Sequence, residues 1–480
     1  MDINCEQNMF RKTKIVCTIG PASDSEQMIE KIVRAGMNVA RLNFSHGNCA
    51  QHANSINKIR KISARLNIPI AILQDLPGPK VRTGDLKQDQ VLLNDGDEFV
   101  LSTREIIGDE HMVSVNLPSF SDDVNEGDKI FLNDGAIALI VLAISNTEVT
   151  CKVINGGILS AEKGVNVPNV RLSIPSVTVD DLEHLKFGLE QKVDYVALSF
   201  VREADDIIGV REFLRERNEI IPLIAKIEKH EAVENIDEII VEADGIMIAR
   251  GDLGVEVPLT KVPLLQKEII SKCNRMGKPV IVATQMLESM IHSPRPTRAE
   301  ASDVANAILD GADAVMLSGE TAVGNYPEES ALIMRQIAIE TELAIPYHSI
   351  LSAKADTVIP QTDDAISYAA CNIAEQISAR AIIAYTTSGS TAHRVAKYRP
   401  GTPILAITTK DIIRRRLALY WGIYPFRIDE CKKLEDLFRQ GAQLAIMSGL
   451  AKEDDLIVLT AGVPIGIPGN TNMLKVQKID

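Results

Sequence analysis

Two short segments of the chain place a lysine and two carboxylates where they could act together. Lys226 and Glu228 end the apolar run that starts at Pro222, and on a strand their side chains leave the same face. Asp252 follows the next apolar run, 245–249. Carboxylates are good ligands for Mg²⁺ or Mn²⁺, and a lysine beside such a metal suits chemistry on a phosphate or an enolate. The lysine–glutamate pair alone is equally compatible with a structural ion pair.

Eight short, almost continuously apolar runs are typical of strands buried on both faces. Helix-period stretches separate most of them, and glycines follow several of these stretches, as a helix C-cap would require. Eight strands that alternate with helices predict a (β/α)₈ barrel of the TIM type. The predicted strands are Ile15–Ile19, Val39–Asn43, Ile70–Gln74, Tyr195–Phe200, Leu223–Ile227, Ile246–Ala249, Val280–Ala283 and Val315–Leu317.

The alternation is interrupted once and ends before the C-terminus. Short alternating strands with Asn-Asp-Gly-type turns fill residues 77–171, which predicts a small β-barrel domain inserted after the third strand, where it could act as a lid. The barrel is then expected over residues 1–76 and 172–345. Residues 346–480 again alternate strands and helices and predict a separate C-terminal α/β domain.

Polar groups follow most of the predicted strands, and the loops after barrel strands meet at one end of the barrel. Each of these segments alone could be an ordinary loop, turn or N-cap. Acidic, basic and hydroxyl side chains gathered at one rim favour a reaction site instead. No Walker motif, kinase-type glycine-rich loop, CxxC pair or HxxxH pattern occurs, so neither large nucleotide-binding class nor a zinc site is expected.

Composition narrows the possible partners. The 480-residue chain has a net charge of −14, which disfavours binding to nucleic acid and to acidic membranes and requires a locally positive phosphate site. No apolar stretch is long enough for a membrane span, and the first residues do not resemble a signal peptide. The seven cysteines form no pairing pattern and are expected to be free thiols. A cytoplasmic location is therefore expected.

Several long, ordered motifs give the chain a resemblance to the pyruvate kinase family from about Lys12 to the C-terminus. They are Thr13-Lys-Ile-Val-Cys-Thr-Ile-Gly-Pro21, Met37-Asn-Val-Ala-Arg-Leu-Asn-Phe-Ser-His-Gly47, Ala225-Lys-Ile-Glu228, Ile248-Ala-Arg-Gly-Asp-Leu-Gly-Val-Glu256, Ala283-Thr-Gln-Met-Leu-Glu-Ser-Met290 and Pro294-Arg-Pro-Thr-Arg-Ala-Glu300. The resemblance implies transfer of the phosphoryl group of phosphoenolpyruvate to ADP, which gives pyruvate and ATP.

The resemblance also implies roles for single residues. Lys226 would stabilise the transferred phosphoryl group and the enolate, and Arg41 would lie near the phosphate. We expect the proton for the enolate to come through water and either Thr284 or Ser318. The expected substrate contacts are Arg41, Gly251, Asp252 and Thr284, and the expected Mg²⁺ or Mn²⁺ ligands are Glu228 and Asp252. The expected nucleotide contacts are Asn43, His46, Arg82 and Lys163, and the expected monovalent-cation neighbourhood is Asn43, Ser45 and Asp75.

Two departures from the family pattern change these expectations. Relatives that require potassium read Asp-Thr-Lys-Gly-Pro-Glu after the third strand, whereas this chain has Leu76 and Lys80 in place of the threonine and the glutamate. The ammonium group of Lys80 could replace a bound K⁺, so little or no K⁺ requirement is predicted. The alternative is that Lys80 points to solvent and K⁺ still binds weakly. The second departure is Glu162, where some relatives have a nucleotide-contacting lysine; the adjacent Lys163 is expected to take over.

The loop formed by Thr386, Thr387, Ser388, Gly389, Ser390 and Thr391 follows a predicted strand and precedes a helix. It could be a phosphate cradle or an ordinary strand-to-helix turn. The resemblance favours a site for a phosphorylated effector, which residues 462–471 could close, and it suggests a homotetramer. Arg414–Arg416 could attract an anion or form a solvated helix face. Two other functions stay open at this point: a metal-dependent barrel aldolase or lyase acting on pyruvate enolates, and a non-catalytic metabolite sensor.

Overall fold

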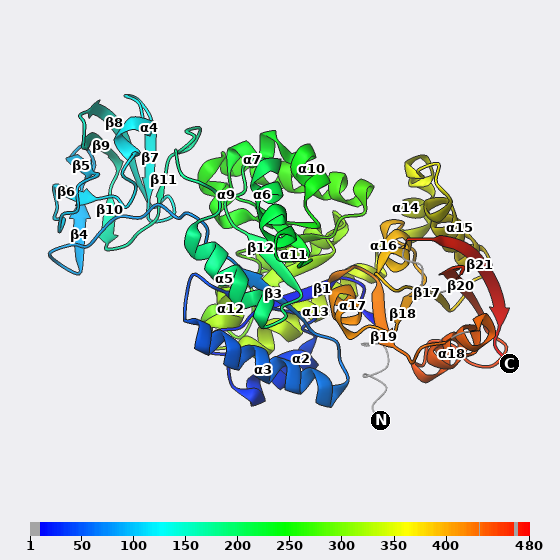
Figure 1. Cartoon of the computed structure of the whole chain (residues 1–480). Helices are drawn as coiled ribbons and strands as arrows, with labels where there is room; N and C mark the ends of the chain where they lie inside the picture. Colours follow the sequence, from blue (N-terminus) through cyan, green and yellow to red (C-terminus); the bar gives the residue numbers. More distant parts are fainter. Residues whose placement is uncertain (1–9, 432, 465–468) are drawn as a thin grey trace.

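The computed structural model of the chain describes residues 10–431, 433–464 and 469–480, which form three bodies in a row (Figure 1). A barrel lies in the middle, the inserted β-domain lies at one end, and the C-terminal α/β domain lies at the other. Among the described residues, no helix combines the length and the apolar character needed to cross a lipid bilayer.

The predicted barrel is confirmed. Eight parallel strands close in the order β1-β16-β15-β14-β13-β12-β3-β2. They are β1 (Lys14–Thr18), β2 (Val39–Asn43), β3 (Ala71–Asp75), β12 (Tyr195–Leu198), β13 (Leu223–Ile227), β14 (Gly245–Ala249), β15 (Val280–Ala283) and β16 (Ala314–Leu317). The bounds of β1, β3, β14 and β16 differ from the predicted ones by one residue, and the end of β12 differs by two. β12 stops at Leu198, because Phe200 has a φ of 54° and turns the chain out of the strand.

Side chains of the barrel strands alternate between the barrel interior and the surrounding helices. In β13, Ala225 and Ile227 belong to the outer core that packs against helices, whereas Ile224 belongs to the inner core. Since successive strand residues point to opposite faces, Lys226 points inward like Ile224, at the end of the strand where the barrel opens.

Helices surround the barrel, and their ends follow local capping signals. Ser25 caps the first of them through its side chain, which accepts a hydrogen bond from Met28 N, and Gly36 ends it with a φ of 128°. The helices are α2 (Glu26–Ala35), α3 (Cys49–Leu66), α5 (Val179–Glu190), α6 (Ala204–Arg215), α7 (His230–Glu234), α8 (Ile236–Glu242), α9 (Arg250–Glu256), α10 (Val262–Met276), α11 (Arg298–Leu309), α12 (Gly319–Ala322) and α13 (Pro327–Leu343). The next helix, α14 (Tyr347–Ala353), lies with the C-terminal domain (Figure 1).

The insertion after β3 forms the predicted small β-domain, called the lid below. A six-stranded sheet, β11-β7-β8-β9-β5-β6, and a two-stranded sheet, β10-β4, share one apolar core. Its elements are β4 (Gln90–Leu93), β5 (Glu98–Ser102), β6 (Met112–Ser114), α4 (Phe120–Asp123), β7 (Lys129–Leu132), β8 (Ile137–Ile144), β9 (Glu148–Asn155), β10 (Gly157–Ser160) and β11 (Val165–Asn166). They fall inside the predicted bounds 77–171, which stay a prediction.

The C-terminal domain contains a five-stranded sheet in the order β19-β18-β17-β20-β21. The predicted strands β17 (Ala381–Tyr385), β18 (Ile404–Thr408) and β20 (Leu456–Gly462) are joined by β19 (Ile423–Arg427) and the antiparallel β21 (Thr471–Lys478). The helices are α15 (Thr362–Gln376), α16 (Ser390–Lys397), α17 (Asp411–Arg416) and α18 (Leu434–Met447).

Helix α17 joins the C-terminal domain to the barrel. Arg414 Nη2 donates to Asn67 O at 2.7 Å, and Arg415 Nε lies 2.8 Å from the buried carboxylate of Asp194. The three arginines of α17 therefore dock one domain on another, which differs from both sequence interpretations, an anion attractor and a solvated helix face.

Candidate active site

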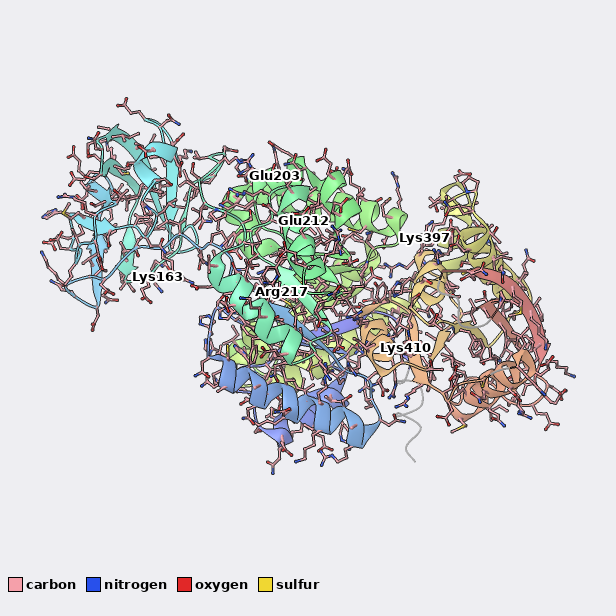
Figure 2. All side chains as sticks on the ribbon, viewed as in Figure 1. Lys163, Glu203, Glu212, Arg217, Lys397 and Lys410 are labelled. Carbon is pink, nitrogen blue, oxygen red and sulfur yellow. The ribbon has the colours of Figure 1, made fainter. Side chains whose placement is uncertain are left out.

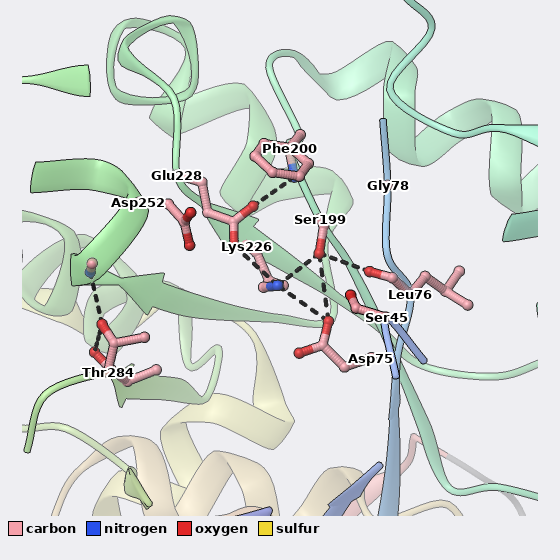
Figure 3. Close-up of polar contacts among 12 residues, drawn as sticks. Ser45, Asp75, Leu76, Gly78, Ser199, Phe200, Lys226, Glu228, Asp252 and Thr284 are labelled. Carbon is pink, nitrogen blue, oxygen red and sulfur yellow. Dashed lines mark hydrogen bonds and ion pairs between the residues drawn. The ribbon is translucent and has the colours of Figure 1, made fainter. Parts of the chain in front are cut away.

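Lys226 is the centre of a buried charge cluster at the barrel mouth (Figure 3). Its Nζ lies 2.9 Å from Glu228 Oε1, 3.2 Å from Asp75 Oδ1 and 2.6 Å from Ser199 Oγ. Burial alone would lower the pKa of Lys226, but Asp75 and Glu228 raise it above its ordinary value. An ammonium group has three N–H donors, so these three contacts use all of them.

Asp75, at the end of β3, bridges two cations. Its Oδ2 accepts a hydrogen bond of 2.6 Å from Arg41 Nε, while its Oδ1 faces Lys226. Burial raises the pKa of this carboxyl, yet Lys226 and Arg41 outweigh burial and hold the pKa below its usual range. Arg41 also donates to Thr18 Oγ1 at 3.0 Å, so its guanidinium is fixed between β1 and β3.

Glu228 and Asp252 place two carboxylates next to each other in the cluster. Glu228 is 1% exposed, and its Oε2 accepts a hydrogen bond of 2.8 Å from Phe200 N. Burial raises the pKa of Glu228; Lys226 opposes the rise and the neighbouring Asp252 adds to it. Asp252 faces Glu228 from the first turn of α9, and Lys80 Nζ lies 3.8 Å from its Oδ1.

This pair of carboxylates fits a divalent cation, because a cation between them would offset both burial and the Asp252 charge, which raise the pKa of Glu228. No group of three or more His, Cys, Asp or Glu side chains within the described ranges could hold a metal. A metal ion here would therefore take its other ligands from substrate or water, which is how Mg²⁺ is often held.

Thr284 holds the loop after β15 in an unusual backbone conformation. Thr284 and Gln285 have φ values of 65° and 55°, which are rare for residues other than glycine and concentrate at functional sites. The Thr284 hydroxyl donates to Ala283 O and accepts from Gly251 N, both at 2.7 Å. These two contacts fix the end of β15 to the start of α9, which carries Asp252.

Ser318, at the end of β16, has a buried hydroxyl with no hydrogen-bond partner among the described residues. Its backbone N–H donates to Glu320 Oε2 at 2.7 Å, and Glu320 Oε1 accepts from Leu287 N at 3.0 Å. The fully buried Glu320 thus ties the loops after β15 and β16 together. The sequence pattern placed Glu320 at the rim, after the eighth predicted strand, but gave it no role.

The other predicted site residues lie on loops around the cluster. Asn43 Oδ1 accepts from Ser45 N at 3.2 Å, and the exposed His46 follows in the same turn. In the lid, Arg82 Nη1 donates to Glu162 O at 3.0 Å. Lys163, labelled in Figure 2, follows Glu162 in the lid, and its N–H donates to Thr83 Oγ1 at 2.9 Å. No hydrogen bond or ion pair between described residues joins His46, Arg82 or Lys163 to Lys226.

The lid touches the barrel next to the metal-binding candidates. Asn166 Nδ2 in β11 donates to Glu256 Oε1 at 3.0 Å, and Lys80 Nζ, in the segment that leads into the lid, lies 3.8 Å from Asp252 Oδ1. Since Glu256 and Asp252 belong to the same helix, α9, the lid is linked directly to the helix that carries a predicted metal ligand.

The predicted effector loop lines a cavity of about 110 Å³ in the C-terminal domain. Its hydroxyls are partly used inside the loop: Thr386 Oγ1 accepts from Gly389 N at 2.8 Å, and Ser388 Oγ lies 3.1 Å from Ser390 Oγ. Gly462 and Asn470 line the same cavity. Part of the segment predicted to close it, 465–468, lies outside the described residues.

A closed (β/α)₈ barrel with an inserted β-domain at its charged mouth defines a class of barrel enzymes rather than a binding module. The family model "Pyruvate kinase, barrel domain" matches residues 10–331, and "Pyruvate kinase, alpha/beta domain" matches residues 364–477.

The sequence similarity to individual pyruvate kinases extends over nearly the whole chain. A pyruvate kinase of Geobacillus stearothermophilus is 48% identical over 98% of this chain and 81% of its own, and one of Clostridium acetobutylicum is 45% identical over 98% and 100%. The crystal structure of a pyruvate kinase from Cryptosporidium parvum superposes with a TM-score of 0.94 at 35% identity and covers 100% of this chain and 98% of its own. The chain belongs to the pyruvate kinase family, and its function is that of a pyruvate kinase.

Proposed function

We propose that the Lys226 cluster is the centre at which this chain transfers the phosphoryl group of phosphoenolpyruvate to ADP. The observation that carries the proposal is a buried lysine held between two carboxylates, one of which faces a third, Asp252. An anionic substrate and a divalent cation are the partners that such a cluster would bind.

The proposed roles follow from the charges of the side chains. Lys226 and Arg41 offset negative charge on the transferred phosphoryl group and on the enolate oxygen that remains. Glu228 and Asp252 would hold Mg²⁺ or Mn²⁺, which when bound neutralises phosphate charge and orients the reacting oxygens. Gly251 and Thr284 would contact the substrate carboxylate.

The enolate must also receive a proton to become pyruvate. The hydroxyl of Ser318, which has no hydrogen-bond partner in the part of the chain that the structure describes, could bond to water, and Thr284 belongs to the neighbouring loop after β15. We assign the pair to a proton relay through water. ADP would enter below the lid, with Asn43, His46, Arg82 and Lys163 as its contacts.

A low requirement for K⁺ is part of the proposal. The carboxylate of Asp75 is already balanced by Arg41 at 2.6 Å and Lys226 at 3.2 Å, so it has little charge left for a monovalent cation. Leu76 brings no hydroxyl ligand, and Lys80 adds a fixed positive charge 3.8 Å from Asp252. Asn43 and Ser45, which complete the expected monovalent-cation neighbourhood, are neutral.

Membership of the family supports two further parts of the proposal, which concern regulation and assembly. A phosphorylated metabolite bound by the loop Thr386–Thr391 would activate the enzyme, which would form a homotetramer in the cytoplasm. Phosphoenolpyruvate saturation curves measured with and without a panel of sugar phosphates and AMP test this; identical curves would contradict the effector site.

An assay of pyruvate formation with phosphoenolpyruvate, ADP and Mg²⁺ tests the activity itself. Pyruvate formation that requires ADP is expected. Pyruvate formed without ADP would instead favour an aldolase or lyase, and no turnover in a correctly folded chain would favour a non-catalytic sensor. The family match and the presence of Lys226, Glu228 and Asp252 argue against both.

A further inference from the structure

Ser199 is a buried side chain in the cluster that the assigned roles do not use. It is 4% exposed, and its Oγ lies 2.6 Å from Lys226 Nζ, 2.7 Å from Leu76 O and 3.5 Å from Asp75 Oδ1 (Figure 3). The contact with Lys226 is the shortest of the three that the ammonium group makes.

The chemistry of its neighbours fixes the direction of these hydrogen bonds. The carbonyl of Leu76 can only accept a hydrogen bond, and the ammonium of Lys226 can only donate. The single O–H of Ser199 therefore donates to Leu76 O, which leaves an oxygen lone pair directed at Lys226. At 3.5 Å, Asp75 is too distant to compete strongly for the same proton.

A hydrogen bond and close packing also fix the backbone around Ser199. Ser199 is the first residue after β12, and the next residue, Phe200, turns away with a φ of 54° and donates its N–H to Glu228 Oε2 at 2.8 Å. Gly78 packs against this turn so closely that a Cβ there would lie 3.0 Å from Ser199 Cβ. One two-residue turn thus positions both Lys226, through a hydroxyl, and Glu228, through an amide.

The three contacts of Lys226 are not equivalent during a reaction. All three N–H groups are used inside the protein, so Lys226 must release one partner before it can donate to a substrate oxygen. Glu228 is the partner that a metal ion would attract. Ser199 is neutral, buried and committed to Leu76 O, so nothing in the proposed reaction draws it away.

We propose that Ser199 is a positioning residue for Lys226: with Asp75 it holds two N–H directions of the ammonium group, so that the third, which now faces Glu228, would be the one available to a substrate oxygen. The proposal rests on the proposed function of the cluster. It predicts that loss of the hydroxyl leaves the charge of Lys226 in place but lets its Nζ move.

Ser199→Ala is the test variant, with Ser330→Ala as its matched control. Ser330 is also fully buried and donates to a backbone carbonyl, Tyr326 O at 2.7 Å, but it lies in α13. Because a misplaced catalytic group costs up to roughly 100-fold in rate, we expect kcat to fall about 10- to 100-fold in Ser199→Ala. The KM for phosphoenolpyruvate should change much less, and Ser330→Ala should keep the kcat of the unmodified enzyme.

Ser199→Thr restores the hydroxyl and should recover most of the kcat lost in Ser199→Ala. Urea unfolding of all three variants identifies any loss of kcat that comes from unfolding. A Ser199→Ala enzyme with unchanged kcat would overturn the proposal, as would a stably folded Ser199→Thr enzyme as slow as the alanine variant.

A second readout does not depend on turnover. Reductive methylation of lysines, quantified by mass spectrometry, measures how freely Lys226 Nζ moves and meets reagent. Labelling of Lys226 should be several-fold faster in Ser199→Ala than in Ser330→Ala; equal labelling would overturn the proposal. If the unmodified chain lacked activity, the proposed function would fail while labelling still decided whether Ser199 holds Lys226.

Discussion

The two ends of the barrel both carry carboxylates in ion pairs, but at the mouth two of the carboxylates, Glu228 and Asp252, face each other. At the end that faces the C-terminal domain, Asp194, Asp244 and Asp313 each stand directly before a strand. Each accepts a hydrogen bond from a backbone N–H of the neighbouring strand and faces an arginine at 2.8 Å. At the mouth, Glu228 instead faces a second carboxylate.

This difference distinguishes carboxylates that stabilise the fold from carboxylates that can bind a further cation. Asp194 has two cationic partners, Arg60 and Arg415, each at 2.8 Å, and its oxygens need nothing further. The pKa of Glu228 is raised, mainly by burial and also by Asp252, so this carboxylate is poised to gain a cation. The same contrast is general in barrel enzymes, in which the amino ends of the strands supply stability and the carboxyl ends supply chemistry.

The largest effect is expected from Lys226→Met at the mouth. Loss of a preorganised positive charge removes stabilisation of the transition state, so kcat should fall by about 10³-fold or more while substrate still binds. Steady-state kinetics and a substrate-binding titration measure the two quantities. Lys397→Met is a matched control, because Lys397 is also 8% exposed and pairs with Asp364 at 3.1 Å, but lies between the barrel and the C-terminal domain (Figure 2). It should lower stability and spare most of kcat; equal kcat losses in both variants would contradict the contrast.

Asp194→Asn tests the opposite end of the barrel. The variant leaves Arg60 and Arg415 without their carboxylate, so the free energy of unfolding should fall by about 3 kcal/mol. The urea midpoint measures the loss, and kcat should change little. The exposed Asp411, which pairs with Arg427, is the control: its replacement by Asn should cost less than about 0.5 kcal/mol. A kcat loss in Asp194→Asn that exceeds its stability loss would show that this end also takes part in the chemistry.

Much of this contrast could be predicted from the sequence, but not all of it. The strands of the barrel were predictable because they are buried on both faces, and Lys226 and Glu228 shared a face by strand geometry alone. Ser199 was missed because the predicted strand was extended through Phe200 and so included the turn that follows β12. The aspartate–arginine pairs were missed because Arg399 and Arg415 lie 86 and 221 residues from their partners, a distance at which no local pattern reports a contact.

Lys80→Glu tests the role of the positive charge of Lys80 at the mouth of the barrel. The unmodified enzyme is expected to be active in buffer free of K⁺ and Na⁺, because Lys80 supplies a fixed positive charge beside Asp252. Removing that charge should make activity depend on KCl, with an activation of about tenfold, equivalent to about 1.4 kcal/mol. Nearly complete loss of activity of the unmodified enzyme without K⁺, restored by KCl, would contradict the role of Lys80.

The smallest effect concerns acid stability in the C-terminal domain. His393 stacks on Tyr420 with ring centroids 3.6 Å apart, and burial, with Arg394 adding to it, lowers the pKa of His393 to about 3. The folded state therefore holds the neutral ring, while the unfolded chain takes up a proton below its ordinary pKa of 6.5. This contribution is complete above pH 6.5 and is lost as the pH falls toward 3, with a slope of at most about 1.4 kcal/mol per pH unit.

His393→Phe keeps the stacked ring but cannot titrate. Urea unfolding between pH 7 and pH 5 should show a shallower loss of stability for the variant than for the unmodified protein. Parallel pH curves would show that His393 does not contribute.

The facing carboxylates of Glu228 and Asp252 beside Lys226 make the mouth a metal-dependent site for phosphoryl transfer in the proposed function. The direct measurement is pyruvate formation from phosphoenolpyruvate in a 2 × 2 design, with and without ADP and with Mg²⁺ or EDTA. We predict pyruvate and ATP in equal amounts only when ADP and Mg²⁺ are both present. Pyruvate formed at the same rate without ADP, or in EDTA, would contradict the account.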